Sequence, residues 1–196
     1  MSTRSIRLFR NNFLESLTHV HPIVPLLFWS PVIVFLLWRA VAVHHMAMTS
    51  IAALLLPGLL VWTFMEYTLH RYVFHFPANS NAGKWLVHLF HGVHHDAPND
   101  KSRLVMPPAG AVIVMAILWG LFSLLIPSPW VEPFLAFFIV GYLIYDYLHY
   151  ATHHFRMRRP WQAKLKRHHM QHHFTSPHSR YGVSSPLWDW VFGTLH

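Results

Sequence analysis

The chain has 196 residues, a formal net charge of +8 and no cysteine, so disulfides and thiolate metal ligands are excluded. Hydrophobic residues make up 54% of the sequence and charged residues only 11%, which excludes an ordinary soluble surface. The positive charge does not indicate a nucleic-acid partner, because the basic residues flank apolar runs, where they meet anionic lipid headgroups. We therefore expect a single-domain membrane protein.

Residues 1–20 form a short basic arm before the first apolar run. Its arginines alternate with large apolar side chains: Arg4, Arg7, Arg10, Phe9, Phe13 and Leu17. This pattern predicts an amphipathic arm that lies on the cytoplasmic surface of the membrane. An arm with no function beyond setting the topology is an equally good interpretation.

Four apolar stretches follow, and a membrane-spanning helix needs about 20 residues. The predicted spans are residues 21–43, 49–69, 109–126 and 131–148. The first is not a cleavable signal, because it contains several prolines and a second span follows at once. Short connections join the spans in pairs. The sequence thus predicts an all-α fold, a membrane four-helix bundle of two hairpins within one domain, residues 21–196.

Charge predicts the orientation of these spans. All fifteen lysines and arginines except Arg39 lie in residues 1–20, 70–108 and 149–196. Under the positive-inside rule these segments are cytoplasmic, together with both termini. The segments 70–108 and 149–196 would then form a helical cytoplasmic cap. A soluble protein with buried helices is the alternative, but it would need a larger core than this chain supplies.

Nineteen histidines are far more than residence in a membrane requires. Ten of them form four spaced groups: His70 and His75; His91, His94 and His95; His149 and His153; His169, His172 and His173. Positions i, i+3 and i+4 share one face of a helix, so each triplet, and the pair His149 and His153, is expected to aim at one point. The first pair is about 140° apart on a regular helix, so its rings would flank a cleft, or the helix would end between them.

Ten imidazoles are too many for one ion, since a catalytic zinc site uses three protein ligands. Two ions with about five histidines each fit better. An all-imidazole set suits iron, copper, nickel or zinc and disfavours magnesium and calcium. Partners of the ligands' second ring nitrogens are also expected. The candidates are Glu66, Asp146, His88, His154, His168 and, more weakly, Asp100, with Asp96, Asp189 and His178 further possibilities.

The motifs and their order resemble the membrane fatty acid hydroxylase family, which includes sterol desaturases, and most closely its fatty acid 2-hydroxylases. The similarity runs from about residue 66 to the end. The matching segments are Glu66-Tyr67-x-x-His70-Arg71-x-x-x-His75, His91-Gly92-x-His94-His95 with the following residues to Pro108, Tyr145-Asp146-x-x-His149-x-x-x-His153, His169-x-x-His172-His173, and the tail from Tyr181 to Thr194.

This resemblance implies a non-haem di-iron monooxygenase that uses O2 and two electrons to hydroxylate a lipid acyl chain, at C2 of a fatty acid or sphingolipid. It implies that the ten spaced histidines are the metal ligands, with iron in the active form and zinc possible in purified protein. Some relatives carry a fused cytochrome b5 domain, which is not expected here, so a separate donor such as cytochrome b5 or ferredoxin with its reductase is implied. The alternatives are a sterol or carotenoid hydroxylase or desaturase and, more distantly, a metal-binding membrane transporter.

Overall fold

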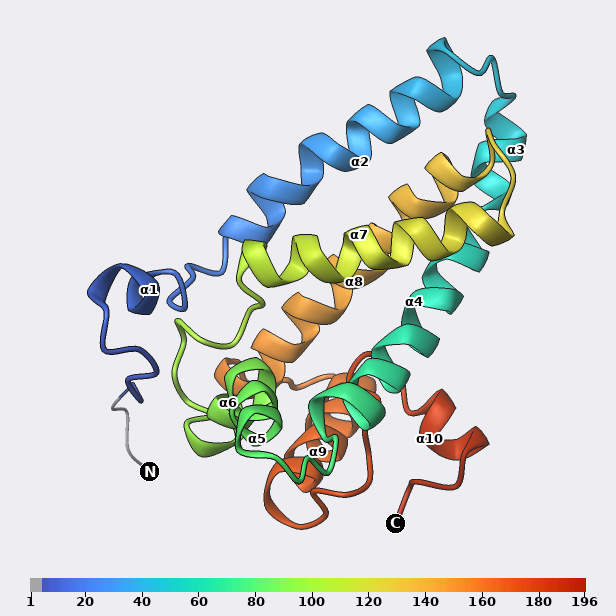
Figure 1. Ribbon diagram of the computed structural model, residues 1–196. Coiled ribbons are helices and arrows are strands. Elements are labelled where there is room, and N and C mark those ends of the chain that lie inside the picture. Colours follow the sequence, from blue (N-terminus) through green and yellow to red (C-terminus); the bar gives the residue numbers. More distant parts are fainter. Residues whose placement is uncertain (1–4) are drawn as a thin grey trace. The chain divides into compact units, whose positions relative to one another are not determined.

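The computed structural model describes residues 5–196, and every regular element in this range is a helix (Figure 1). Four helices are long and apolar enough to cross a membrane, so the predicted all-α fold with four spans is confirmed. The first residues of the predicted arm, including Arg4, lie outside the described range. The chain forms two compact units. We call Met1–Pro22, Thr63–Val105 and Tyr145–His196 the histidine unit, and Ile23–Trp62 and Met106–Ile144 the apolar unit.

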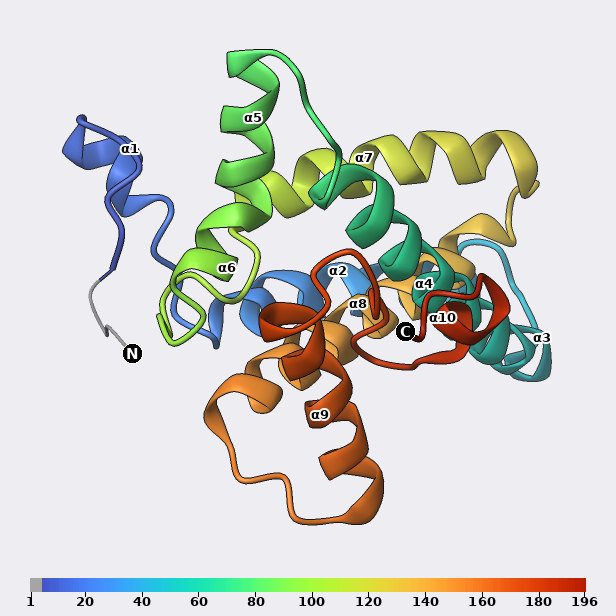
Figure 2. The same ribbon diagram turned by 90° about the horizontal axis from the view of Figure 1, so that it is seen from below.

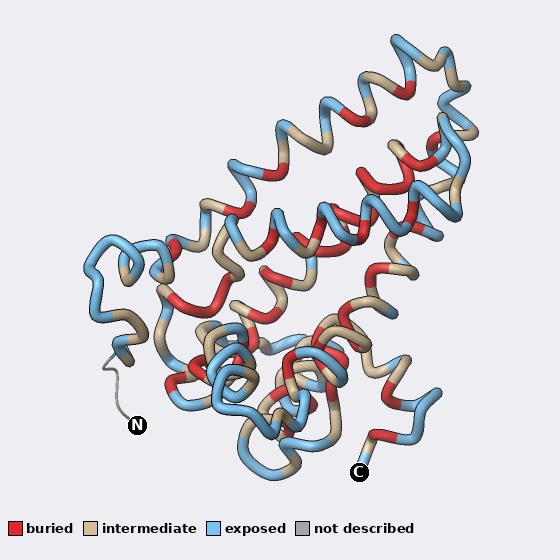
Figure 3. The backbone as a smooth tube through the Cα atoms, viewed as in Figure 1, coloured by how far each residue is buried: buried red, intermediate tan, exposed pale blue. Residues whose placement is uncertain are grey.

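In the apolar unit the first part of α8 (Val131–His154) is largely buried, whereas the other helices expose much of their surface (Figure 3). The unit contains α2 (Val24–Ala42), α3 (Met48–Ala53), α7 (Pro108–Leu125) and the first parts of α4 (Leu55–Leu69) and α8. Large side chains point outward along them, such as Leu56, which is 75% exposed, and Leu124, which is 84% exposed. Such surface is unfavourable in water and favourable in lipid, which fits a multi-pass membrane protein.

Two of the four candidate spans are longer than predicted. The second runs over Met48–Phe74 and the fourth over Val131–His154, both beyond the predicted ends at residues 69 and 148. The predicted ends lie where each apolar run stops. Helical hydrogen bonding does not require apolar side chains, and no proline or glycine follows either run immediately, so both helices continue into the histidine motifs.

Aromatic side chains and glycines form the core of the apolar unit. The Trp62 ring meets Phe138 and Tyr142 edge-on, with centroids 5.1 and 5.4 Å away. Gly141 permits this close approach, because a Cβ atom there would lie 2.6 Å from Cβ of Trp62. By contrast, a Cβ at Gly120 would have no neighbour within 4 Å.

We expect Gly141→Ala to lower the thermal unfolding midpoint of the detergent-solubilised protein. The added methyl overpacks the contact with Trp62, at a cost of about 1–3 kcal/mol. Gly120→Ala is the matched control, since it adds the same methyl to an exposed helix position, where alanine is favoured by about 1 kcal/mol. Equal midpoints for the two variants would contradict the close packing at Gly141.

The one cation outside the predicted cytoplasmic segments is paired. Arg39 donates from Nε and Nη2 to the two carboxylate oxygens of Glu132, both at 2.9 Å. The His44 ring lies 3.4 Å from the same carboxylate. A bidentate pair of this kind is stronger than a neutral hydrogen bond, and it allows both charges to lie near the ends of apolar helices.

The histidine unit consists of shorter helices, seen from below in Figure 2. In addition to the ends of α4 and α8 it contains α1 (Asn12–Ser16), η1 (His70–Phe74), α5 (Asn81–Val87), η2 (His88–Gly92), α6 (Val93–Asp96), α9 (Pro160–Phe174) and α10 (Leu187–Val191). The elements η1 and η2 are π-helical turns.

The N-terminal arm is anchored within the histidine unit. The buried Arg103 side chain donates to Glu15 and to Ser5, and Val20 N donates to Ser102 O at 2.7 Å. Phe13 remains 69% exposed on α1. The position of the arm on the membrane surface stays a prediction.

Candidate metal centre

The structure gathers all ten spaced histidines into two groups of five within the histidine unit. Each residue offers one ring nitrogen, and within a group these nitrogens all lie within 4.8 Å of one another. Group A is His70, His75, His91, His95 and His172, and group B is His94, His149, His153, His169 and His173. Every ring in both groups is buried or half-buried.

Each histidine triplet is divided between the groups, which corrects the expectation that a triplet aims at one point. His91 and His95 belong to group A, whereas His94 belongs to group B. In the same way, α9 contributes His172 to group A, and His169 and His173 to group B. Positions i+3 and i+4 are about 100° apart around the helix axis, so a helix that lies between two sites supplies both.

A π-helical turn explains how His70 and His75 reach the same group. His75 N donates to His70 O at 3.1 Å, the hydrogen bond five residues apart that defines a π turn. The wider turn reduces the angle between the two positions, and the ring centroids lie 5.0 Å apart. The rings thus meet on one side of the helix, and the helical conformation continues as far as Phe74.

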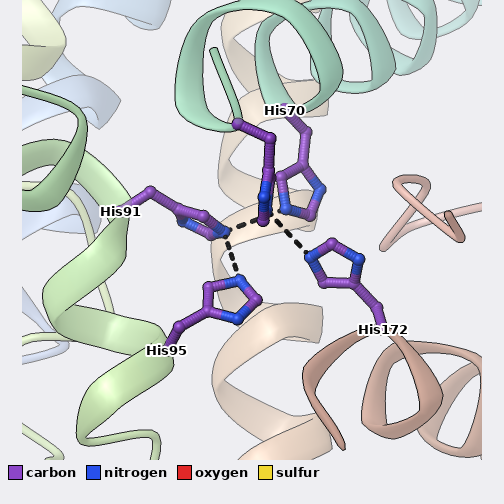
Figure 4. A group of neighbouring side chains, drawn as sticks. His70, His91, His95 and His172 are labelled. Atoms are coloured by element: carbon purple, nitrogen blue, oxygen red, sulfur yellow. Dashed lines mark hydrogen bonds between the residues drawn. The ribbon is translucent and has the colours of Figure 1, made fainter. Parts of the chain in front are cut away.

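The ring nitrogens of group A converge in a pattern that hydrogen bonds alone do not explain (Figure 4). His91 Nε2 lies 2.9 Å from His70 Nε2 and 3.0 Å from His95 Nε2, and His172 Nε2 lies 3.1 Å from His75 Nε2. A ring nitrogen carries either one proton or one lone pair, so His91 Nε2 cannot serve two such contacts as a donor and an acceptor at once. A cation bound by these nitrogens would account for both contacts.

Group B repeats this arrangement. His94 Nε2 lies 2.9 Å from His149 Nε2 and 3.0 Å from His173 Nε2. His169 Nε2 lies 2.8 Å from His153 Nε2 and 3.0 Å from His173 Nε2. Two imidazole nitrogens bound at right angles to an ion, each about 2.1 Å from it, are about 3.0 Å apart. The residues of both groups therefore fit a nitrogen-ligated transition metal.

Two backbone carbonyls orient rings of group A. His70 Nδ1 donates to Tyr181 O at 2.5 Å, and His172 Nδ1 donates to Ser179 O at 2.7 Å. A proton held on Nδ1 leaves the lone pair on Nε2, the atom that faces the group. These carbonyls could not be recognised from side-chain patterns.

Two buried carboxylates hold the segment that carries these carbonyls. Asp189 accepts from Tyr181 N and Gly182 N, both at 2.8 Å, and from His168 Nε2 at 3.0 Å. Thr194 Oγ1 also donates to Asp189, at 2.7 Å. Asp189 is fully buried, although the sequence marked it only as a weak candidate. His168 belongs to neither histidine group, and its ring contacts Asp189 instead.

Glu66 acts on the same segment from α4. Its carboxylate accepts from Val183 N at 2.6 Å, from Ser184 N at 2.8 Å and from the Ser184 hydroxyl. Both carboxylates therefore fix the loop on which Tyr181 lies. They act on His70 indirectly, through the backbone carbonyl of Tyr181.

The remaining candidates differ in their surroundings. Asp146 is buried. Asp100 accepts from Ser102 N and Oγ in the loop after α6, at 3.0 and 2.7 Å. His88 Nδ1 lies 3.6 Å from the Asp96 carboxylate, and His154 Nε2 is shielded without a hydrogen-bond partner in the described part of the chain. None of these four candidates belongs to either histidine group.

Burial keeps the histidines in the form that binds metals. It lowers the pKa of His75 to about 4, and neighbouring His172 contributes to this shift. Burial likewise lowers the pKa of His95 to about 3 and that of His172 to about 4. These rings are therefore neutral at pH 7, and a metal ion would not have to displace a proton from a charged imidazolium.

A cavity of about 460 Å³ opens onto group A. His75, His91 and His95 line it, together with His88 and His178. Small molecules that enter this cavity therefore reach three residues of group A.

Comparison with known proteins places these features in a family. The fatty acid hydroxylase family model matches residues 55–194. The Arabidopsis thaliana dihydroceramide fatty acyl 2-hydroxylase FAH1 is 39% identical over 193 residues, which cover 96% of this chain and 79% of that protein. The Saccharomyces cerevisiae ceramide very long chain fatty acid hydroxylase SCS7 is 40% identical over 186 residues, covering 93% of this chain and 48% of that protein.

A solved structure agrees with the fold. It is described as full-length scs7p with only the hydroxylase domain visible, and it superposes with a TM-score of 0.86 at 40% identity. The match covers 93% of this chain and 69% of that chain.

Proposed function

The chain belongs to the fatty acid hydroxylase family, and from this premise we propose that it hydroxylates the acyl chain of a membrane lipid at C2. The observation that carries the proposal is the pair of five-imidazole groups, built from residues of the matched region. Relatives with 39% and 40% identity are named for 2-hydroxylation of dihydroceramide acyl chains and for hydroxylation of the very long acyl chains of ceramides. The substrate is therefore a fatty acyl chain or the N-acyl chain of a sphingolipid.

The ten histidines of groups A and B hold two metal ions in this proposal, with iron in the active form. Iron in these groups supplies the chemistry that inserts one oxygen atom of O2 into a C–H bond, with two electrons and two protons converting the other atom to water. Zinc binds imidazole more tightly than ferrous iron does, so purified protein is expected to retain zinc when iron is scarce.

The residues of this chain keep the site neutral and fixed. The carbonyls of Ser179 and Tyr181 hold their imidazoles in one tautomer. Asp189 and Glu66 accept from backbone amides beside the Tyr181 carbonyl and fix this part of the loop. His70 and His172 thus present unprotonated Nε2 atoms that need no rearrangement before metal binding, and the burial of the site limits competing reactions with water.

Membrane residence suits a lipid substrate, and the electrons come from a separate protein in this proposal. Cytochrome b5, or a ferredoxin with its reductase, is a suitable donor. The proposed arrangement places residues 1–20, both termini and the segments 70–108 and 149–196 on the cytoplasmic side, with residues 21–196 as the hydroxylase domain. The distribution of lysine and arginine supports this orientation.

Lipid mass spectrometry tests the proposal. The chain and its His172→Ala variant are expressed in a host with a competent electron donor, and the released fatty acids are compared. We expect 2-hydroxy acids with the unchanged chain and at least about a 100-fold decrease with the variant, since loss of even an outer partner of a ligand costs about 10–100-fold. Metal-loaded protein that adds no oxygen to acyl chains, but oxidises sterols or carotenoids, would refute the acyl assignment.

A further inference from the structure

A second cavity, of about 660 Å³, lies between α9 and the C-terminal segment of the histidine unit. Its lining includes three cations, Lys164, Arg167 and Arg180, and two indoles, Trp161 and Trp190. No residue of group A or group B lines it, although His168 does. The metal centre therefore does not account for this cavity.

The lining is positively charged without compensation. It includes no carboxylate, and among the described residues none of the three cations forms an ion pair. Arg180 Nε is shielded from solvent and has no hydrogen-bond partner in this part of the chain. A shielded donor without an acceptor is unfavourable, so the cavity favours an anion that accepts hydrogen bonds.

The backbone holds Arg180 in an uncommon conformation. Its φ of 60° lies in the left-handed region, which is unfavourable for a side chain other than glycine. The hydrogen bond from Arg180 N to Thr194 O, at 2.8 Å, supports this conformation. Arg180 also lies between Ser179 and Tyr181, whose carbonyls orient two rings of group A. An anion bound to Arg180 would therefore brace the segment that orients these rings.

The aromatic part of the lining indicates what carries the anion. Trp161 is 53% exposed and Trp190 is 71% exposed. Tryptophan is enriched where a membrane meets water, and the volume is that of a small-molecule site. We propose that this cavity binds the headgroup of an anionic membrane phospholipid, with the phosphate between the three cations and the glycerol region against the indoles. Lipid binding in this cavity does not require that the proposed hydroxylation occurs.

Native mass spectrometry of the full chain in detergent tests the proposal. The protein is titrated with phosphatidylglycerol and with phosphatidylcholine that carries the same acyl chains. We expect phosphatidylglycerol to bind in preference. The Lys164→Gln/Arg167→Gln variant should lower its affinity about tenfold or more, because it removes two charged donors. Arg156→Gln/Arg158→Gln is the matched control, since it removes the same charge from exposed positions outside the cavity and should change little.

A second variant addresses Arg180 alone. Arg180→Asn removes the guanidinium, and asparagine tolerates the left-handed conformation, so the fold should be retained. We expect a comparable loss of affinity for phosphatidylglycerol, with an unchanged thermal unfolding midpoint. Equal losses in the Arg156/Arg158 control, equal binding of both lipids, or complete displacement by millimolar inorganic phosphate would each overturn a phospholipid site.

Discussion

Replacement of His91 by alanine is expected to remove one of the two proposed metal ions and to lower the proposed hydroxylase activity at least about 100-fold. His91 Nε2 lies within 3.0 Å of two other ring nitrogens, so its loss opens the centre of group A. His94, three residues along the chain, belongs to group B, and His94→Ala is expected to remove the other ion. Metal analysis of the purified variants, loaded under identical conditions, measures both effects.

Double variants separate the two groups. The His91→Ala/His95→Ala chain should retain one ion, because both residues serve group A, whereas His91→Ala/His94→Ala should retain none. His88→Ala is the matched control, since His88 lies in the same helical segment and belongs to neither group. Loss of both ions from the His91/His95 variant, with its helix content preserved, would contradict the division of the triplet.

The histidine spacing was sufficient to predict the residues that meet, but not how they are divided. A motif with histidines at i, i+3 and i+4 shows that the rings share one side of a helix. Whether they share one site depends on what lies opposite, because the i+3 and i+4 rings diverge by about 100°. The histidine spacing does not predict where α6 and α9 lie relative to the other histidines. The division of His94 from His95 therefore emerged only in the structure.

The π turn at His70 was also beyond pattern reasoning. On a regular helix five residues separate two rings by about 140°, so the sequence allowed rings that flank a cleft or a helix that ends between them. The hydrogen bond from His75 N to His70 O changes the local period, and no residue type announces such a turn. The spacing of His70 and His75 did indicate an irregularity, since two residues five apart do not share one face of a regular helix.

The other site groups that the sequence did not predict act through the backbone. Ser179 and Tyr181 contribute carbonyl oxygens, which every residue possesses, so no motif distinguishes them. Asp189 lies far along the chain from the histidines it affects, and it acts through the backbone of Tyr181. The predicted carboxylate Glu66 reaches the same segment through Val183 and Ser184. Charge at the end of an apolar span was a usable signal for Glu66, whereas Asp189 lies at no such end and was only a weak candidate.

Asp189→Asn is expected to weaken metal binding in group A about 10–100-fold and to lower the thermal midpoint. The Asp189 carboxylate accepts from two backbone amides, a hydroxyl and the His168 ring. Asparagine has one acceptor oxygen, and its amide group would face a donor. A buried donor left without an acceptor costs about 1–3 kcal/mol. The loop that carries Tyr181 O would then hold the His70 tautomer less firmly.

The single-group variants make this prediction specific. In a His94→Ala chain, which should hold only the group A ion, Asp189→Asn should lower the metal content at a limiting free metal concentration. In a His91→Ala chain, which should hold only the group B ion, it should leave the metal content unchanged. Asp96→Asn is the control for loss of an acidic charge, since the Asp96 side chain is 59% exposed. Equal losses from both backgrounds would show that Asp189 supports the whole unit, and not the orientation of group A.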